Sequence, residues 1–194
     1  MKNRIKLIKK YFRSKSADEN ETVTKYLEED IDNVLSRAHT LIGIKKGDLS
    51  EPLVIITPNS FYEGGKVRYR IIKLDDEYRV DYDQSMVTSI YLTNESLYYH
   101  QASVNHNNGV IDFDIAGELN LFDVTHTETI LDYDNVENPK VSQLIFRLNL
   151  VDGSNIEFYL RDHFLHDEYY LETLMTEEEE YVINTIKEAI RKSK

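Results

Sequence analysis

The chain has 194 residues, of which 41% are hydrophobic, so we expect one generous domain with appendages. It contains no cysteine, which excludes disulfides, thiolate metal sites and cysteine nucleophiles, and no apolar run approaches the roughly 18 residues of a membrane span. The net charge of −12 is uneven: seven of the 23 bases and none of the 35 acids lie in residues 1–15, so the other 16 bases face 35 acids, a balance of −19.

The N-terminal segment, residues 1–17, is basic and amphipathic. A helix here would place Ile5, Ile8 and Phe12 on one stripe. The cations spread around the rest of the helix are Lys2, Arg4, Lys6, Lys9, Lys10 and Arg13. Such a helix can lie on an anionic membrane, or it can pack on the acidic body of its own chain, and both interpretations stay open.

Residues 18–45 are predicted to form a second helix that packs on a sheet. Asp18, with Glu21 three residues later, has the form of a capping box. Apolar residues then recur at helical spacing from Val23 to Ala38, and Gly43 is a suitable place for the chain to leave the helix.

From about residue 52 to residue 161 the apolar period changes to two, with turn residues every eight to twelve positions, which predicts antiparallel strands. The strands are expected at 66–74, 77–83, 86–93, 96–101, 110–115, 142–151 and 155–161, with 121–131 as a further candidate. No Lys or Arg occurs from Val80 to Pro139, whereas eleven acids do, so this region would repel nucleic acid and anionic lipid.

Three hairpins have a register that the pattern specifies, with turns at 75–76, 93–96 and 151–153. In chain order the predicted pairs are Tyr69 with Tyr82, Arg70 with Asp81 and Ile71 with Val80; Leu92 with Leu97, Tyr91 with Tyr98 and Ile90 with Tyr99; and Leu148 with Ile156, Arg147 with Glu157, Phe146 with Phe158 and Leu144 with Leu160. The cross-strand acids indicate that Arg68 and Arg70 form ion pairs rather than bind phosphate.

The last element is an amphipathic helix at 176–192. Thr176 and Glu179 form a capping box, acids fill the first turn, and Arg191 and Lys192 lie in the last turn. Together with the strands it makes a predicted third unit, residues 46–194.

Strands forming one bent sheet, closed by a C-terminal helix, resemble the pleckstrin-homology (PH) superfold over about residues 52–192. The segment Tyr91-Leu92-Thr93-Asn94-Glu95-Ser96-Leu97-Tyr98-Tyr99 is similar to a hairpin of GRAM and bacterial PH-like domains. The resemblance implies an α+β fold, a PH-like bent antiparallel sheet or barrel capped by a C-terminal helix, and a binding module without catalysis. Lipid-binding members carry Lys and Arg in the loop between their first two strands; here that loop reads Leu74-Asp75-Asp76-Glu77, which favours a protein partner.

Three acid–aromatic–acid triplets, at 81–83, 112–114 and 132–134, could bind a divalent cation, but each is better explained as a solvated acidic face with a buried ring. His163 and His166 have metal-ligand spacing and are interpreted as surface residues. Serines such as Ser85, Ser89 and Ser96 lie in no nucleophile elbow. We therefore expect neither an active site nor a metal or cofactor.

These observations predict a cytoplasmic, non-enzymatic protein-interaction or scaffold module that binds no nucleic acid. The expected contact residues for a protein partner are Tyr91, Tyr98, His100, Asp112 and Asp114, because tyrosine supplies contact area with a polar tip. Those tyrosines could instead pack under the N-terminal helix. Two alternatives stay open: peripheral attachment to an anionic membrane through the N-terminal cations, and an acidic immunity or inhibitor protein that neutralises a basic toxin or nuclease.

Overall fold

A computed structural model describes residues 2–14, 20–43, 51–59, 61–74, 77–133, 141–162 and 174–194. Its helices are α1 (Lys2–Tyr11), α2 (Glu21–Leu41) and α3 (Glu177–Ser193), with a 3₁₀ turn, η1 (Leu121–Asp123). The predicted unit boundaries at 17/18 and 45/46, the turn at 75–76 and the pair His163 and His166 lie outside the described residues. None of the described helices has the length and apolarity needed to cross a membrane.

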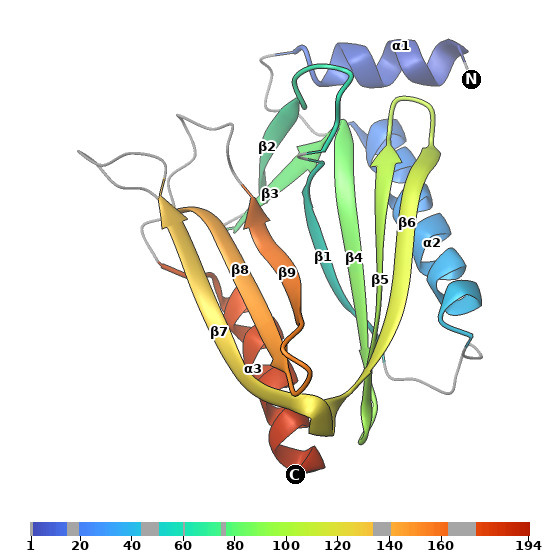
Figure 1. The fold of residues 1–194 in the computed structure, drawn as a ribbon. Helices are drawn as coiled ribbons and strands as arrows, with labels where there is room; N and C mark the ends of the chain where they lie inside the picture. The colour runs from blue at the N-terminus through green and yellow to red at the C-terminus, as the bar shows by residue number, and fades with distance from the viewer. Residues whose placement is uncertain are drawn as a thin grey trace.

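The strands form three antiparallel sheets that do not close into a barrel (Figure 1). The first sheet has the order β1-β4-β5-β6, the second consists of β2 and β3, and the third has the order β7-β8-β9. Their bounds are β1 (Leu53–Pro58), β2 (Tyr69–Leu74), β3 (Glu77–Tyr82), β4 (Gln84–Leu92), β5 (Ser96–Asn105), β6 (Val110–Asn120), β7 (Val124–Tyr133), β8 (Val141–Leu150) and β9 (Asn155–Asp162).

The α+β class and the C-terminal helix are confirmed, whereas the expectation of one continuous bent sheet is wrong. The hairpin β2–β3 forms a sheet of its own, beside the other two. The further candidate at 121–131 is confirmed as β7, and β1, which the predicted set lacked, completes the first sheet. β1 lies beside β9, which brings the two larger sheets together along one side.

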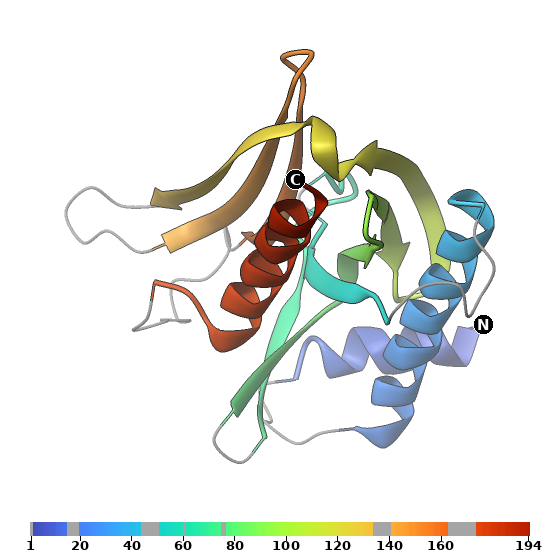
Figure 2. The ribbon, with the colours of Figure 1, turned by 90° about the horizontal axis from the view of Figure 1, so that it is seen from below.

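The main core lies between the two larger sheets and α3. Figure 2 shows α3 between these sheets, where Val182, Ile183, Ile186 and Ile190 form its buried stripe. They pack with residues of the first sheet, such as Ile90, and of the third sheet, such as Phe146, Phe158 and Leu160. The capping box of Thr176 and Glu179 is present as predicted, and Glu179 also pairs with the buried Arg161 of β9.

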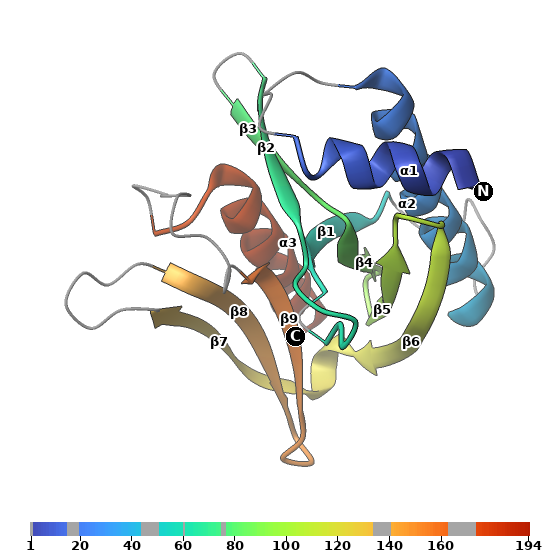
Figure 3. The same ribbon diagram turned by 90° about the horizontal axis from the view of Figure 1, so that it is seen from above.

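The N-terminal helices pack on the outer face of the first sheet and against β2 (Figure 3). Ile8 and Tyr11 of α1, and Phe12 just after it, are buried with Val23 and Leu27 of α2 and Ile72 of β2. Val34 of α2 covers Val87, Ala102 and Val104. Asp18 of the expected capping box lies outside the described residues; Asn20 is the N-cap of α2, because its side chain accepts from the Val23 amide. Gly43 follows the helix end with φ +72°, as a C-terminal glycine should.

The hairpin registers agree with the sequence except at one position. All predicted pairs of β2–β3 and β4–β5 are present, and so are the three pairs of β8–β9 nearest the turn, where Gly153 has φ +84°. The expected pair of Leu144 with Leu160 is wrong. A bulge between Leu144 and Ile145 shifts the register, so that Leu144 lies opposite Arg161.

Candidate functional site

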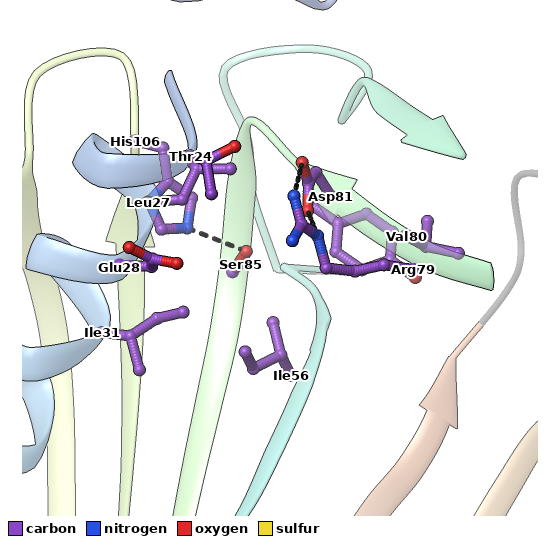
Figure 4. Close-up of a pocket in the computed structure, with 11 residues that line it drawn as sticks. Thr24, Leu27, Glu28, Ile31, Ile56, Arg79, Val80, Asp81, Ser85 and His106 are labelled. Carbon is purple, nitrogen blue, oxygen red and sulfur yellow. Dashed lines mark hydrogen bonds and ion pairs between the residues drawn. The ribbon is translucent and has the colours of Figure 1, made fainter. Parts of the chain in front are cut away.

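A pocket of about 200 Å³ lies between the first half of α2 and strands β1, β3 and β4 (Figure 4). Its apolar wall is formed by the side chains of Leu27, Ile31, Ile56 and Val80. Ser85 and His106 also line it and are hydrogen-bonded to each other. The lining also includes Thr24, Glu28, Arg79, Asp81 and Tyr82, so the pocket combines an aliphatic wall with several hydroxyl and charged groups.

Asp30, His106 and Ser85 form a buried hydrogen-bonded chain that joins three segments. His106, in the turn between β5 and β6, has Nδ1 at 2.7 Å from Asp30 Oδ2 and Nε2 at 3.0 Å from Ser85 Oγ. The arrangement fits the neutral tautomer in which Nδ1–H donates to the Asp30 carboxylate and Nε2 accepts from the Ser85 hydroxyl. All three side chains are at most 3% exposed.

Arg4 joins α1 to this chain. Its guanidinium pairs with the Asp30 carboxylate and donates to the His106 carbonyl oxygen, with Nη2 at 3.0 Å and Nε at 3.2 Å, and it lies over the Tyr26 ring. Gly109 makes room for the cluster. A Cβ there would lie 2.9 Å from an Asp30 oxygen, and φ is +72°. We call Arg4, Asp30, Ser85 and His106 the Asp30 cluster.

The order Ser85, His106, Asp30 matches the distances of a serine-hydrolase triad, yet its surroundings differ from those of an acyl-transfer site. Ser85 lies in β4, where Pro58 of β1 is opposite it on one side and Val104 of β5 on the other. The backbone groups beside Ser85 therefore belong to sheet ladders instead of converging on an oxyanion. The Asp30 cluster is best described as a polar lock that holds α1 and α2 on the sheet.

Four of the five predicted partner residues, Tyr91, Tyr98, His100 and Asp114, lie on one face of the first sheet, the face that α2 covers in part. Tyr91 and His100 are fully buried beneath α2, where the His39 and Tyr91 rings lie 5.2 Å apart. The prediction that these two contact a partner is therefore corrected, because α2 already covers them. Tyr98 is half-buried, and a hydrogen bond with Glu118 raises the pKa of its phenol.

The other two predicted contact residues lie on β6. Asp112 is exposed and accepts a hydrogen bond from Ser103. Asp114 forms a 2.7 Å ion pair with Arg37 of α2, and the Arg37 side chain is half exposed. Asp112 thus remains at the surface, whereas Asp114 is only 14% exposed; both lie on the strand that ends the first sheet.

None of the family models, curated proteins and solved structures compared with this chain matches it.

His100 is an unusual buried base. Neither of its ring nitrogens has a hydrogen-bond partner among the described residues, and burial lowers the pKa of its imidazole, an effect that Asp114 partly offsets and Arg37 reinforces. The neutral ring is therefore the form that the fold accommodates.

The acidic triplets differ from their expected arrangement. Asp81 and Asp83 are buried and hydrogen-bonded: Asp81 accepts from the Tyr11 hydroxyl at 2.9 Å and from Arg79, and Asp83 accepts from the Arg68 amide at 2.8 Å. Burial raises the pKa of the Asp83 carboxyl. In the second triplet the Phe113 ring is exposed instead of buried. Among the described residues, no group of three or more His, Cys, Asp or Glu is placed to hold a metal ion.

The basic N-terminal helix packs on its own chain. Its apolar residues Ile8, Tyr11 and Phe12 are buried, and Arg4 is committed to the Asp30 cluster. The five other predicted cations remain exposed on the outer side: Lys2, Lys6, Lys9, Lys10 and Arg13.

Sequence reasoning missed the Asp30 cluster, although one signal was present. Val23, Leu27, Asp30, Val34 and Ala38 follow one another at intervals of three or four and are all buried. An acid at an interior position of an apolar stripe requires a buried partner. Nothing in the sequence identifies Arg4, Ser85 or His106 as that partner, because they come from three distant segments.

Proposed function

We propose that this chain is a non-catalytic protein-interaction module with a PH-like fold. Its strand order supports this. Apart from the inserted hairpin β2–β3, seven antiparallel strands are followed by one helix, α3, that enters the core between the two larger sheets. Seven strands and a closing C-terminal helix are what the PH resemblance implies.

The observation that carries the function is the set of exposed acids and exposed aromatic rings on β6, η1 and β7, three elements whose own sequence contains no lysine or arginine. Residues 80–133 contain no Lys or Arg and nine acids, of which Asp81 and Asp83 are buried and the others lie outside the core. The large apolar side chains exposed on β6, η1 and β7 are Val110, Phe113, Ile115, Phe122 and Tyr133. The same elements carry exposed acids, including Asp112, Glu118 and Asp123; Glu118 lies on the opposite face of β6 from Phe113 and Ile115. Acidic charge attracts a basic partner and the rings supply contact area.

The partner is therefore a protein with a basic surface. The proposal includes the inhibitor or immunity role, since neutralising a basic toxin or nuclease needs the same complementarity. Peripheral membrane docking is less favoured, because the apolar stripe of α1 is buried and only its cations remain available.

A biosensor experiment tests this function. The intact chain is passed over an immobilised small folded protein of strongly positive net charge, at increasing ionic strength. The expected result is association whose on-rate falls steeply with salt, and which weakens in the double variant Asp112→Lys/Glu118→Lys. The single control Glu188→Lys, on α3, should bind like the parent. If the parent shows no association at low salt, the proposed function is wrong.

A further inference from the structure

We propose that the free edge of β6 binds an extended basic segment of the partner by strand addition, a mode that rests on the proposed function. β6 ends the order β1-β4-β5-β6 and pairs with β5 from Val110 to Asn120, with one bulge at Asp112, so the regular ladder runs from Phe113 to Asn120. Figure 3 shows it at the outer end of its sheet. A strand in this position presents a row of backbone N–H and C=O groups that can pair with another chain.

This edge strand also exposes large apolar side chains, which a bound segment could bury. Phe113 and Ile115 lie on the same face of β6 and are 53% and 46% exposed, whereas Leu119 further along that face is in the core. A long edge strand with exposed apolar side chains is an aggregation hazard unless something pairs with it or repels its own copies.

Charge decides which occupant fits. Asp114 and Glu118 lie on the opposite face of β6 from Phe113 and Ile115, and Asp112 is exposed beside them. A second copy of this chain would set acids against acids across the new ladder, which is destabilising. A segment carrying Lys or Arg would instead set opposite charges against one another.

The alternation of β6 also specifies the pattern of that segment. In an added strand, successive side chains lie on opposite faces, next to the corresponding faces of β6. A basic residue would lie beside Glu118, because Asp114 on the same face is already paired with Arg37, and apolar residues would lie beside Phe113 and Ile115. The occupant is therefore an extended stretch of about six residues in which Lys or Arg alternates with Val, Ile or an aromatic residue.

A labelled peptide of alternating Lys and Val, titrated with the intact protein and followed by fluorescence anisotropy, tests the proposal. A peptide of equal composition with its lysines grouped together is the sequence control. Glu118→Lys and Glu188→Lys change the net charge equally, and only the first lies on β6. Thermal unfolding checks that both variants keep the parental midpoint, and amide hydrogen exchange of residues 110–120 reports pairing of the strand.

We expect the alternating peptide to bind more tightly than the grouped one and to slow exchange in residues 110–120. Affinity should fall roughly tenfold in Glu118→Lys, since an attractive cross-strand pair becomes repulsive, and stay unchanged in Glu188→Lys. Equal loss in both variants, unslowed exchange or no peptide binding overturns strand addition. If the folded basic protein still binds with salt dependence, the interaction module survives that result; if it also fails to bind, both proposals fall.

Discussion

Replacing Asp30 with asparagine tests whether the Asp30 cluster locks the N-terminal helices to the sheet. The carboxylate receives charge-assisted hydrogen bonds from Arg4 and from His106, and its side chain is 3% exposed. Each such bond contributes about 1.5–3 kcal/mol, and the amide oxygen of the introduced asparagine would keep one as a weaker neutral bond. Leaving a buried charge without its partner costs about 3–5 kcal/mol.

The cost at Arg4 should fall below that range, because 16% of its side chain is exposed and it keeps its bonds to the His106 carbonyl. We therefore expect Asp30→Asn to lower the free energy of unfolding by about 2–4 kcal/mol. Urea unfolding followed by far-UV circular dichroism measures this, and tyrosine fluorescence gives a second probe because the chain lacks tryptophan.

Glu29→Gln is the matched control, since Glu29 is the preceding residue of α2 and is exposed. It removes the same charge and should change stability by less than about 0.5 kcal/mol. Arg4→Met completes a double-mutant cycle, in which a coupling energy of about 1–3 kcal/mol is expected. A loss in Asp30→Asn no larger than that in Glu29→Gln, with no coupling to Arg4, would refute the lock.

Three further predictions concern His100, Gly109 and Ser85. Burial depresses the pKa of His100, so its contribution to stability is full above the unfolded pKa of about 6.5 and is lost as pH falls below it. In urea unfolding, His100→Leu should therefore lose less unfolding free energy between pH 7.5 and 5.5 than the parent. An equal loss in both proteins would contradict this. Gly109→Ala should lower the unfolding free energy by about 1–3 kcal/mol, since the new Cβ would contact Asp30 and the backbone is left-handed. Gly153 is also left-handed but has open space around its Cβ position, so Gly153→Ala should cost only about 1 kcal/mol. Equal losses on urea unfolding would show that the contact with Asp30 is unimportant. Fluorophosphonate labelling followed by mass spectrometry should leave Ser85 unmodified, and a Ser85 adduct absent from Ser85→Ala would favour acyl transfer instead.

Local pairing was predictable because a strand's side-chain period is two and each turn admits few loop lengths. With a three-residue turn ending at Gly153, Phe146 can face Phe158 and Arg147 can face Glu157, and both pairs form. The hydrophobic pattern could not predict the bulge next to Leu144, because Leu144 is buried whether Leu160 or Arg161 lies opposite it. Periodicity records which face a side chain takes, and a bulge keeps the face while changing the partner.

The grouping of hairpins into sheets was not predictable in the same way. The hairpin β2–β3 has strong alternation and a correct register, but its separation from the other sheets depends on packing with α1, where Ile72 joins Ile8, Tyr11 and Phe12. Alternation requires each strand to bury one face. It does not say whether a sheet or a helix will supply the cover.

The same reasoning explains why the N-terminal helix left two interpretations open. Apolar burial is non-directional, so the stripe of Ile8 and Phe12 could lie on lipid as well as on protein. Charge discriminates, because a buried carboxylate in the apolar stripe of α2 needs a cation within reach, and Arg4 provides it. An acid in the apolar stripe of α2 thus indicates that some cation or donor must pack against it, and the structure shows that α1 supplies that cation.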